Sequence, residues 1–266
     1  MKGKVKTSIV QMDMKFADPK ANFLHAEALI RKAAEDKPDV IVLPETWNTG
    51  FFPVENLAEL CDHEGKDTKT RIGNLAKELH INIVAGSVSN VKDGKVYNSA
   101  FIFDRTGSCV GEYDKIHVFT PMQEDVYYQK GDHLCTFELD GHKCGIIICY
   151  DIRFPELARA LALKDIELLF ICAQWPAVRS YHWQLLTAAR AVENQLFVAA
   201  CNSCGTAGKT VYGGRSVILD PWGEVIKQGG SQEEIFTGEI DFSKLQEIRS
   251  SINVFRDRRP ELYKKF

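Results

Sequence analysis

Short strand-like runs alternate with amphipathic stretches along the chain. Residues 5–12 have the apolar and β-branched content that is typical of a strand. Asp18 and Pro19 then supply a helix cap and a first-turn proline, and apolar side chains recur after them every three or four residues, which predicts a helix. The same alternation predicts further strands over residues 39–43, 81–88, 167–171, 196–200, 215–219 and 235–240, and further helices over 67–79, 155–163 and 180–194.

Two short polar turns interrupt this alternation and predict hairpins. Asp93 and Gly94 separate one pair of strand-like runs, and Asp140 and Gly141 separate another. Strand–helix units beside hairpins predict an α/β protein with a mixed sheet, or with two stacked sheets and helices outside. The chain shows no linker, repeat or low-complexity tract, so we expect one domain over residues 1–266, with a C-terminal tail over about 242–266.

The segment from residue 144 to residue 156 is the most informative. Its apolar run stops at Cys149, a polar turn follows, and an amphipathic helical pattern begins. Such a turn puts the side chain at the strand tip on the carboxyl edge of the sheet, where α/β proteins bind ligands. Free N–H groups at the start of the next helix can bind a negative oxygen and favour a thiolate. The pattern favours Cys149 as a nucleophile, although a buried structural cysteine would also end a strand.

Three further charged residues occupy comparable places. Glu45 lies just beyond a buried strand, and a carboxylate at the rim of a core tends to hold a proton, as a general base must. Lys115 ends another strand-like run, where an ammonium group could stabilise an oxyanion. Glu124 lies in an aromatic-rich loop. Taken singly, each of them could equally be an exposed surface side chain.

Charge and composition narrow the partners and the compartment. The net charge is −3 with acids and bases interspersed, so we expect no nucleic-acid partner and no membrane partner. No apolar stretch approaches the roughly 20 residues of a membrane span, and no signal peptide is recognisable. Eight cysteines, several inside apolar runs, indicate a cytoplasmic protein without disulfides. Neither the C-x-x-C pair Cys201 and Cys204 nor the scattered histidines have metal-ligand spacing, so we expect no metal and no cofactor.

Several of these segments together resemble one known family. The runs Leu-Pro-Glu at 43–45, Tyr-Asp-Lys-Ile-His at 113–117 and Cys-Tyr-Asp-Ile-Arg-Phe-Pro-Glu at 149–156 are similar to the Glu, Lys and Cys signatures of the nitrilase (carbon–nitrogen hydrolase) superfamily. Residues 175–183 and 189–195 extend the resemblance, which is closest to the omega-amidase branch. The resemblance implies an α-β-β-α sandwich of two mixed sheets with outer helices, and a homodimer formed through the helical faces near the cysteine.

The resemblance also implies a role for each matching residue. Cys149 matches the nucleophile, Glu45 the general base and Lys115 the cation that stabilises the oxyanion. Glu124 matches a second glutamate that holds the lysine and the substrate in place, and the backbone N–H of Tyr150 is the expected second oxyanion donor. An amide is a poor electrophile, so its cleavage needs both a thiolate and a stabilised tetrahedral oxyanion.

Aromatic side chains gather around these residues and predict a small pocket. Arg179 is expected to bind a substrate carboxylate, whereas Arg153 is expected to pair internally with Asp151 or Glu156. His117 remains a weaker alternative as the base. The residues predicted to contact substrate are Trp47, Phe51, Phe119, Tyr128, Trp175 and Arg179, with Phe52, Tyr127 and Trp183 as further aromatic candidates.

Together these features predict an amidase that releases ammonia from a small omega-amide, such as 2-oxoglutaramate or 2-oxosuccinamate, through a cysteine thioester. An N-carbamoyl amidase or a nitrile hydrolase would use the same Glu–Lys–Cys residues and stays open. A catalytically silent binding or scaffold protein on the same fold is a third possibility, against which the intact Glu45, Lys115 and Cys149 argue.

Overall fold

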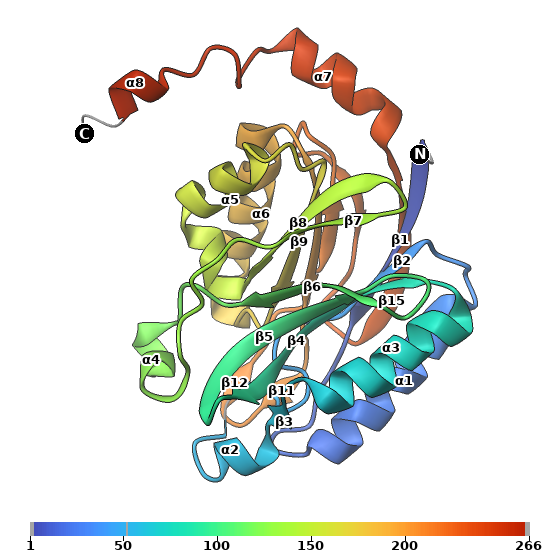
Figure 1. Cartoon of the computed structure of the whole chain (residues 1–266), viewed down its shortest axis with the longest axis vertical. Helices are drawn as coiled ribbons and strands as arrows, with labels where there is room; N and C mark the ends of the chain where they lie inside the picture. The colour runs from blue at the N-terminus through green and yellow to red at the C-terminus, as the bar shows by residue number, and fades with distance from the viewer. Residues whose placement is uncertain (1–2, 52, 264–266) are drawn as a thin grey trace.

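Two β-sheets packed against each other form the centre of the molecule, and helices cover the outer face of each sheet (Figure 1). The computed structural model describes residues 3–51 and 53–263. Both sheets contain parallel and antiparallel neighbours. The predicted fold class, an α-β-β-α sandwich of two mixed sheets, is therefore confirmed.

The first sheet runs in the order β15, β1, β2, β4, β5, β6, with the short β3 beside β4. Neighbours β1, β2 and β4 are parallel, whereas β15, β5 and β6 join antiparallel. Helices α1 (Pro19–Ala34) and α3 (Lys66–Leu79) cover its outer face (Figure 1). The strands are β1 (Lys4–Gln11), β2 (Val40–Val42), β3 (Asp62–His63), β4 (Asn82–Lys92), β5 (Lys95–Phe103), β6 (Cys109–Asp114) and β15 (Glu234–Asp241).

The second sheet runs in the order β14, β13, β10, β9, β8, β7, and its three central strands β8, β9 and β10 are parallel. Helices α5 (Pro155–Ala162) and α6 (Ser180–Asn194) lie on its outer face (Figure 1). The strands are β7 (Thr136–Leu139), β8 (His142–Ile148), β9 (Leu168–Ala173), β10 (Phe197–Asn202), β13 (Val217–Leu219) and β14 (Val225–Gln228).

Short elements connect or follow the two sheets. The segment after β15 begins with a 3-10 turn and continues as α7 and α8 along one end of the sandwich, where Leu245 and Ile248 of α7 are buried (Figure 1). It corresponds to the predicted tail, of which residues 264–266 lie outside the described part. The remaining elements are α2 (Leu57–Leu60), α4 (Glu124–Tyr127), β11 (Thr206–Ala207), β12 (Thr210–Val211), α7 (Leu245–Ser251), α8 (Pro260–Tyr263) and 3-10 turns at Thr120–Met122, Cys149–Arg153, Ala177–Arg179 and Phe242–Lys244.

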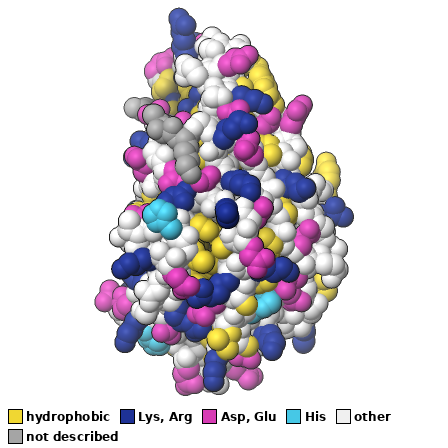
Figure 2. Space-filling model, turned by 90° about the vertical axis from the view of Figure 1, so that its right-hand side faces the viewer, with side chains coloured by type: hydrophobic (Ala, Val, Ile, Leu, Met, Phe, Trp, Pro, Cys, Tyr) yellow, Lys and Arg dark blue, Asp and Glu magenta, His cyan; other side chains and the backbone are white. Residues whose placement is uncertain are grey.

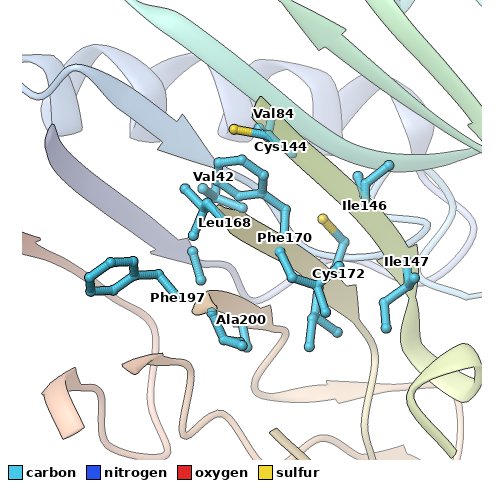
Figure 3. Packing of buried hydrophobic residues seen from close by; sticks show 14 of the residues in the cluster. Val42, Val84, Cys144, Ile146, Ile147, Leu168, Phe170, Cys172, Phe197 and Ala200 are labelled. Atoms are coloured by element: carbon cyan, nitrogen blue, oxygen red, sulfur yellow. The ribbon is translucent and has the colours of Figure 1, made fainter. Parts of the chain in front are cut away.

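The core has three apolar layers, one between the sheets and one under each pair of outer helices, because side chains of a strand alternate between the faces of its sheet. In β2, Val40 and Val42 point between the sheets, whereas Ile41 packs with the residues under α1 and α3. Phe170 of β9 lies in the layer between the sheets together with Val42 and Val84 (Figure 3). The central strands are buried on both faces, which is why they appear in the sequence as apolar runs.

All eight cysteines carry free thiols. Cys201 and Cys204, the C-x-x-C pair, are buried, and their sulfurs approach the backbone carbonyls of Val10 and Gln11. Cys144 and Cys172 lie in the core between the sheets (Figure 3). These four cysteines therefore contribute to packing.

The surface is charged without a single dominant sign on the face shown in Figure 2, where acidic and basic side chains are interspersed. This agrees with the net charge of −3. Within residues 3–51 and 53–263, every helix is too short or too polar to cross a lipid bilayer.

Ends of strands from both sheets converge at one place. Glu45 follows β2, Lys115 follows β6, Cys149 follows β8 and Gln174 follows β9. The backbone N–H of Gln174 donates to Glu45 Oε2 at 2.8 Å, and the Lys115 ammonium lies 2.8 Å from Glu45 Oε1. The fold thus gathers polar side chains at the ends of otherwise apolar strands.

Gly86 shapes the turn that carries Glu45. It has a φ of +61° at a register shift of β4 against β5. A Cβ at this position would lie 1.9 Å from the carbonyl oxygen of Pro44 and 2.6 Å from that of Leu43. The absence of a side chain therefore allows the Leu43–Pro44 backbone to pass close to β4 before it reaches Glu45.

Gly86→Ala should destabilise the protein by about 3 kcal/mol or more. The added methyl group would overlap the backbone of Leu43 and Pro44, and the positive φ would also strain an alanine. The substitution should also lower activity by moving Glu45. Gly94→Ala is the matched control, since Gly94 has a φ of +73° with nothing within 4 Å of its added Cβ. We expect this control to cost only about 1–2 kcal/mol, and urea unfolding measures both. Equal losses in the two variants would contradict a special role for the close approach at Gly86.

Candidate active site

Cys149 sits on a sharp turn between β8 and α5. It is the first residue of a 3-10 turn, has a φ of +46° and is 9% exposed. A non-glycine residue in this region of φ is strained, so surrounding contacts must hold it there. Such a turn presents the side chain at the tip of the strand, as the sequence predicted.

Asp151 supplies those contacts. Its carboxylate is fully buried and accepts hydrogen bonds on both oxygens. Oδ2 accepts from the Tyr113 hydroxyl at 2.8 Å and from the Ile148 N–H at 3.0 Å. Oδ1 accepts from the His117 N–H at 2.9 Å and lies 2.8 Å from His117 Nδ1. One carboxylate therefore ties the Cys149 turn to the segment that carries Lys115.

Lys115 lies between two glutamates. Its Nζ is 2.8 Å from Glu45 Oε1 and 3.0 Å from both carboxylate oxygens of Glu124. The side chains of all three residues have no exposed surface. Charges this deeply buried persist when they are paired and hydrogen-bonded, and each member of this group has its partner.

The backbone and one amide complete the surroundings of the two carboxylates. The Gln174 N–H donates to Glu45 Oε2 at 2.8 Å, and the Phe119 N–H donates to Glu124 Oε2. Asn98 Nδ2 lies 2.8 Å from Glu45 Oε1 and 3.4 Å from Glu124 Oε1. Both carboxylates are thus fixed by donors from separate segments of the chain.

Burial determines the protonation of the nucleophile. It raises the pKa of the Cys149 thiol well above its ordinary value, the negative charge of Glu45 raises it further, and the positive charge of Lys115 opposes them. The sequence had suggested an environment that favours a thiolate. The structure instead favours a neutral thiol hydrogen-bonded to Glu45, because burial and the carboxylate outweigh the ammonium group.

The charges of Lys115 and Glu124 respond to the same burial. Burial alone lowers the pKa of Lys115, but the carboxylates of Glu124 and Glu45 outweigh it and hold that pKa well above the ordinary value. Burial raises the pKa of Glu124, Glu45 adds to the rise, and Lys115 opposes it. Lys115 therefore keeps its positive charge beside Cys149 over the whole physiological pH range.

A narrow cavity opens onto Cys149 and Lys115. Of the residues predicted to contact substrate, Phe51, Phe119, Trp175 and Arg179 line it. The backbone of Tyr150, the predicted oxyanion donor, follows Cys149 in the same turn, and its side chain also lines the cavity. The other lining residues are Met122, Arg153, Gln174, Pro176 and Tyr212.

Trp47 and Tyr128, also predicted as substrate contacts, are not among the residues that line this cavity. Trp47 is buried in the layer under α1, where Nε1 donates to the Ala85 carbonyl at 2.7 Å and the ring packs edge-on against Phe23. Tyr128 is buried, and its hydroxyl lies 2.6 Å from Ser89 Oγ. The side chains of tryptophan and tyrosine are commonly buried when their polar atom has a hydrogen-bond partner, as it does in both residues here.

Four further expectations concern neighbouring aromatic and histidine side chains. Trp183 of α6 is fully buried and belongs to the apolar core. The cavity lining does not include Tyr127, and Phe52 lies outside the described residues. The His117 ring, considered as a base, instead contacts Asp151 and stacks on Phe154 with ring centroids 3.6 Å apart.

Arg153 also differs from its prediction. Within residues 3–51 and 53–263 it forms no ion pair with Asp151 or Glu156. Asp151 is taken up by its four donors, and the Arg153 guanidinium lies over the Trp175 ring, 4.8 Å from the centroid. Arg179 lies likewise over Phe119 at 5.3 Å. The cavity therefore carries two cations that the described acidic side chains do not neutralise.

Sequence reasoning missed several of the cavity residues, and Gln174 and Tyr212 show two different reasons. Gln174 directly follows β9, so the strand-end argument that identified Cys149 could have found it. Tyr212 comes from the base of the small β11–β12 hairpin, and nothing in the local sequence marks that hairpin as close to β8. In the described part of the chain, no three His, Cys, Asp or Glu side chains form a group that could hold a metal ion.

Comparison with known proteins gives consistent matches along almost the whole chain. A family model described as carbon-nitrogen hydrolase matches residues 6–250. The chain is 44% identical to the 2-oxoglutaramate amidase of Bacillus subtilis (strain 168), over 96% of this chain and 98% of that protein. It is 34% identical to the omega-amidase NIT2 of Homo sapiens, over 91% of each. A solved CN-hydrolase superfamily protein of Xanthomonas campestris, with an arsenic adduct in its active site, aligns with a TM-score of 0.90 and 30% identity over 96% of this chain and 97% of that one.

Asp151→Asn should destabilise the protein by about 3 kcal/mol. The new NH₂ group would face N–H and O–H groups that donate hydrogen bonds to the carboxylate in the wild-type protein, and a donor cannot accept those bonds. The substitution should also reduce turnover, since the Cys149 turn and Lys115 lose their common anchor. Urea unfolding and a turnover assay measure the two effects. Tyr113→Phe removes one of the four donors and should cost only about 1 kcal/mol. If Asp151→Asn were no more damaging than Tyr113→Phe, Asp151 would not be the anchor.

Proposed function

Because the chain belongs to the carbon–nitrogen hydrolase family, we propose that it hydrolyses a small omega-amide to a carboxylate and ammonia through a thioester on Cys149. One observation carries the proposal above all. A buried cysteine on a strained turn shares a narrow cavity with a lysine whose ammonium group is held by two buried carboxylates. This arrangement supplies a nucleophile, a base and a fixed positive charge within one site.

We propose that Glu45 transfers protons in both halves of the reaction. As Sγ attacks the amide carbon, the Glu45 carboxylate takes the thiol proton. The oxyanion that forms is stabilised by the Lys115 ammonium group and the Tyr150 N–H. Glu45 then gives its proton to the departing nitrogen, the C–N bond breaks, and ammonia leaves. A water molecule loses a proton to Glu45, attacks the thioester, and the C–S bond breaks as Cys149 regains a proton.

The raised pKa of Cys149 supports this use of Glu45. Since burial and Glu45 keep the resting thiol neutral, the proton must leave as the C–S bond forms. We propose that Glu124 serves Lys115: it pairs with both oxygens on Nζ and keeps the ammonium group charged and directed toward the cavity. The two buried glutamates thus have separate roles.

The substrate that we propose is the amide of a short dicarboxylic acid, such as 2-oxoglutaramate or 2-oxosuccinamate. Two relatives bear the names 2-oxoglutaramate amidase and omega-amidase. In the cavity, Arg179 and Arg153 would bind the free carboxylate at the end opposite the amide. Phe51, Phe119 and Trp175 enclose a space that suits a short acyl chain.

We further propose a cytoplasmic homodimer. The outward face of α6 and the turn before it carry exposed apolar side chains, among them Val178 (87%), Tyr181 (71%) and Leu185 (53%). A contiguous apolar face of this kind favours association with a second copy, as the sequence resemblance implied. The eight free thiols suit a reducing compartment.

Glu45→Gln tests the proposed mechanism. It removes the base and also one cause of the raised pKa of Cys149. Burial still raises that pKa, Lys115 still lowers it, and the negative charge of Glu45 no longer adds to the rise. Acylation by a reactive ester or amide should therefore continue slowly, while water attack lacks its base and hydrolysis falls by about 10²-fold or more. Intact-protein mass spectrometry should show one acyl group, and peptide mapping should place it on Cys149.

Two further variants serve as controls for this experiment. Cys149→Ala should be folded and inactive and should take up no acyl group, whereas Cys204→Ser should keep most activity because Cys204 packs away from the cavity. Full turnover in Glu45→Gln, or an adduct on a cysteine other than Cys149, would refute the assignment.

Arg179→Ala tests the substrate class. It should raise KM for 2-oxoglutaramate by roughly 10- to 100-fold, which corresponds to the binding free energy of one charge-assisted hydrogen bond. The KM for a neutral amide of similar length should change little. Lys130→Ala removes an equal charge from an exposed position outside the cavity lining and should leave both constants unchanged. Equal effects of Arg179→Ala on the charged and the neutral amide would rule out carboxylate recognition by this residue.

A further inference from the structure

Asn98 contacts more of the site than any argument from the sequence suggested. It lies on β5, fully within the sheet, and is 1% exposed. Its Nδ2 donates to Glu45 Oε1 at 2.8 Å and approaches Glu124 Oε1 at 3.4 Å. Its backbone carbonyl accepts from the Lys115 N–H at 2.9 Å. Asn98 therefore touches three of the four polar site residues, but it does not line the cavity.

The donors around Glu45 divide its two carboxylate oxygens. Oε1 accepts one hydrogen bond from Lys115 Nζ and one from Asn98 Nδ2, and these two bonds use both lone pairs of Oε1. Oε2 accepts from the Gln174 N–H, and no second donor among the described residues bonds to it. Glu45 also acts on Cys149, because its negative charge raises the pKa of the thiol. The second lone pair of Oε2 is therefore the acceptor available for the thiol proton.

The orientation of the Asn98 amide leaves its carbonyl oxygen without a hydrogen bond, which costs free energy. Asn98 Oδ1 is buried and has no hydrogen-bond partner among the described residues. Turning the amide over would place this oxygen against two carboxylates, so the observed orientation is the favourable one. A buried polar atom left without a partner calls for an explanation, and the bridge between Glu45 and Glu124 supplies it.

We propose that Asn98 is a positioning residue whose NH₂ group bridges Glu45 and Glu124 and turns the Glu45 carboxylate so that Oε2 receives the Cys149 proton. Without this bridge, only Lys115 and the Gln174 N–H hold the Glu45 carboxylate, and the direction of Oε2 toward the thiol is less firmly set. The inference rests on the proposed role of Glu45 as the base. It adds a fifth residue to the catalytic group, and that residue acts only through the others.

The test compares kcat and KM from pH 5 to pH 9 for two variants. Asn98→Ala should lower kcat by about 10²-fold with little change in KM, because the base is misplaced while the cavity is intact. Asn98→Asp keeps the shape but adds a carboxylate. It should be the less active variant at pH 7 and should recover as pH falls, because a protonated carboxyl group can donate one hydrogen bond.

Asn82→Ala is the matched control. Asn82 is also a buried asparagine whose Nδ2 donates to a carboxylate, that of Asp140 at 3.0 Å, but it lies at the opposite end of β4 from the site. It should lower the melting temperature and leave the shape of the pH profile unchanged. Wild-type kcat in Asn98→Asp at pH 7, a loss in Asn98→Asp that is the same at every pH, or a loss in Asn98→Ala that appears in KM instead of kcat would overturn the proposal. If one Asn98 variant fails to fold, the kcat and KM of the other decide.

Glu45→Gln in the same assay separates this inference from the function on which it rests. If Glu45→Gln keeps full turnover, the proposed function itself is wrong. If Glu45→Gln is inactive while the Asn98 variants behave like the wild-type protein, only the positioning role of Asn98 is wrong.

Discussion

The ion cluster of Lys115 with Glu45 and Glu124 is the interaction on which the site depends. Three charged side chains with no exposed surface meet where the segments that follow β2 and β6 approach the first residue of α4. Removing one member of such a cluster leaves an uncompensated buried charge, which costs about 3–5 kcal/mol. The loss of any one of the three groups therefore lowers stability as well as activity, and folding itself assembles the polar groups that the chemistry uses.

The rest of the site is organised by how the surrounding strands end. Strands β2 and β9 and the end of β8 are apolar and buried on two faces, so polar residues appear only beyond their last apolar position. Glu45, Cys149 and Gln174 are such residues. Asp151 then joins the Cys149 turn to the Lys115 segment, so the nucleophile and the cation keep a fixed separation although they belong to different sheets.

The same logic explains what the sequence could and could not predict. Apolar runs and their ends predicted the strands and the helices and put Cys149 at a strand tip, because these depend on local pattern. Glu45 and Lys115 were selected by their resemblance to the family signatures, since each taken singly could have been an exposed side chain. The direction in which a loop side chain points depends on tertiary packing. Trp47 and Tyr128 lie beside site residues in the sequence but turn into the core, whereas Tyr212 reaches the cavity from a distant hairpin. Arg153 was expected to pair with Asp151, and only the structure shows that other donors occupy that carboxylate.

The positive φ of Cys149 has a consequence for the evolution and engineering of this protein. Glycine is the residue that this backbone accepts without strain, so a chain selected for thermal stability alone would place glycine there. The cysteine persists at the cost of folding free energy, which the contacts of Asp151 offset. Stability and activity therefore compete at position 149, and a more heat-resistant version of this enzyme must gain its stability elsewhere in the sandwich.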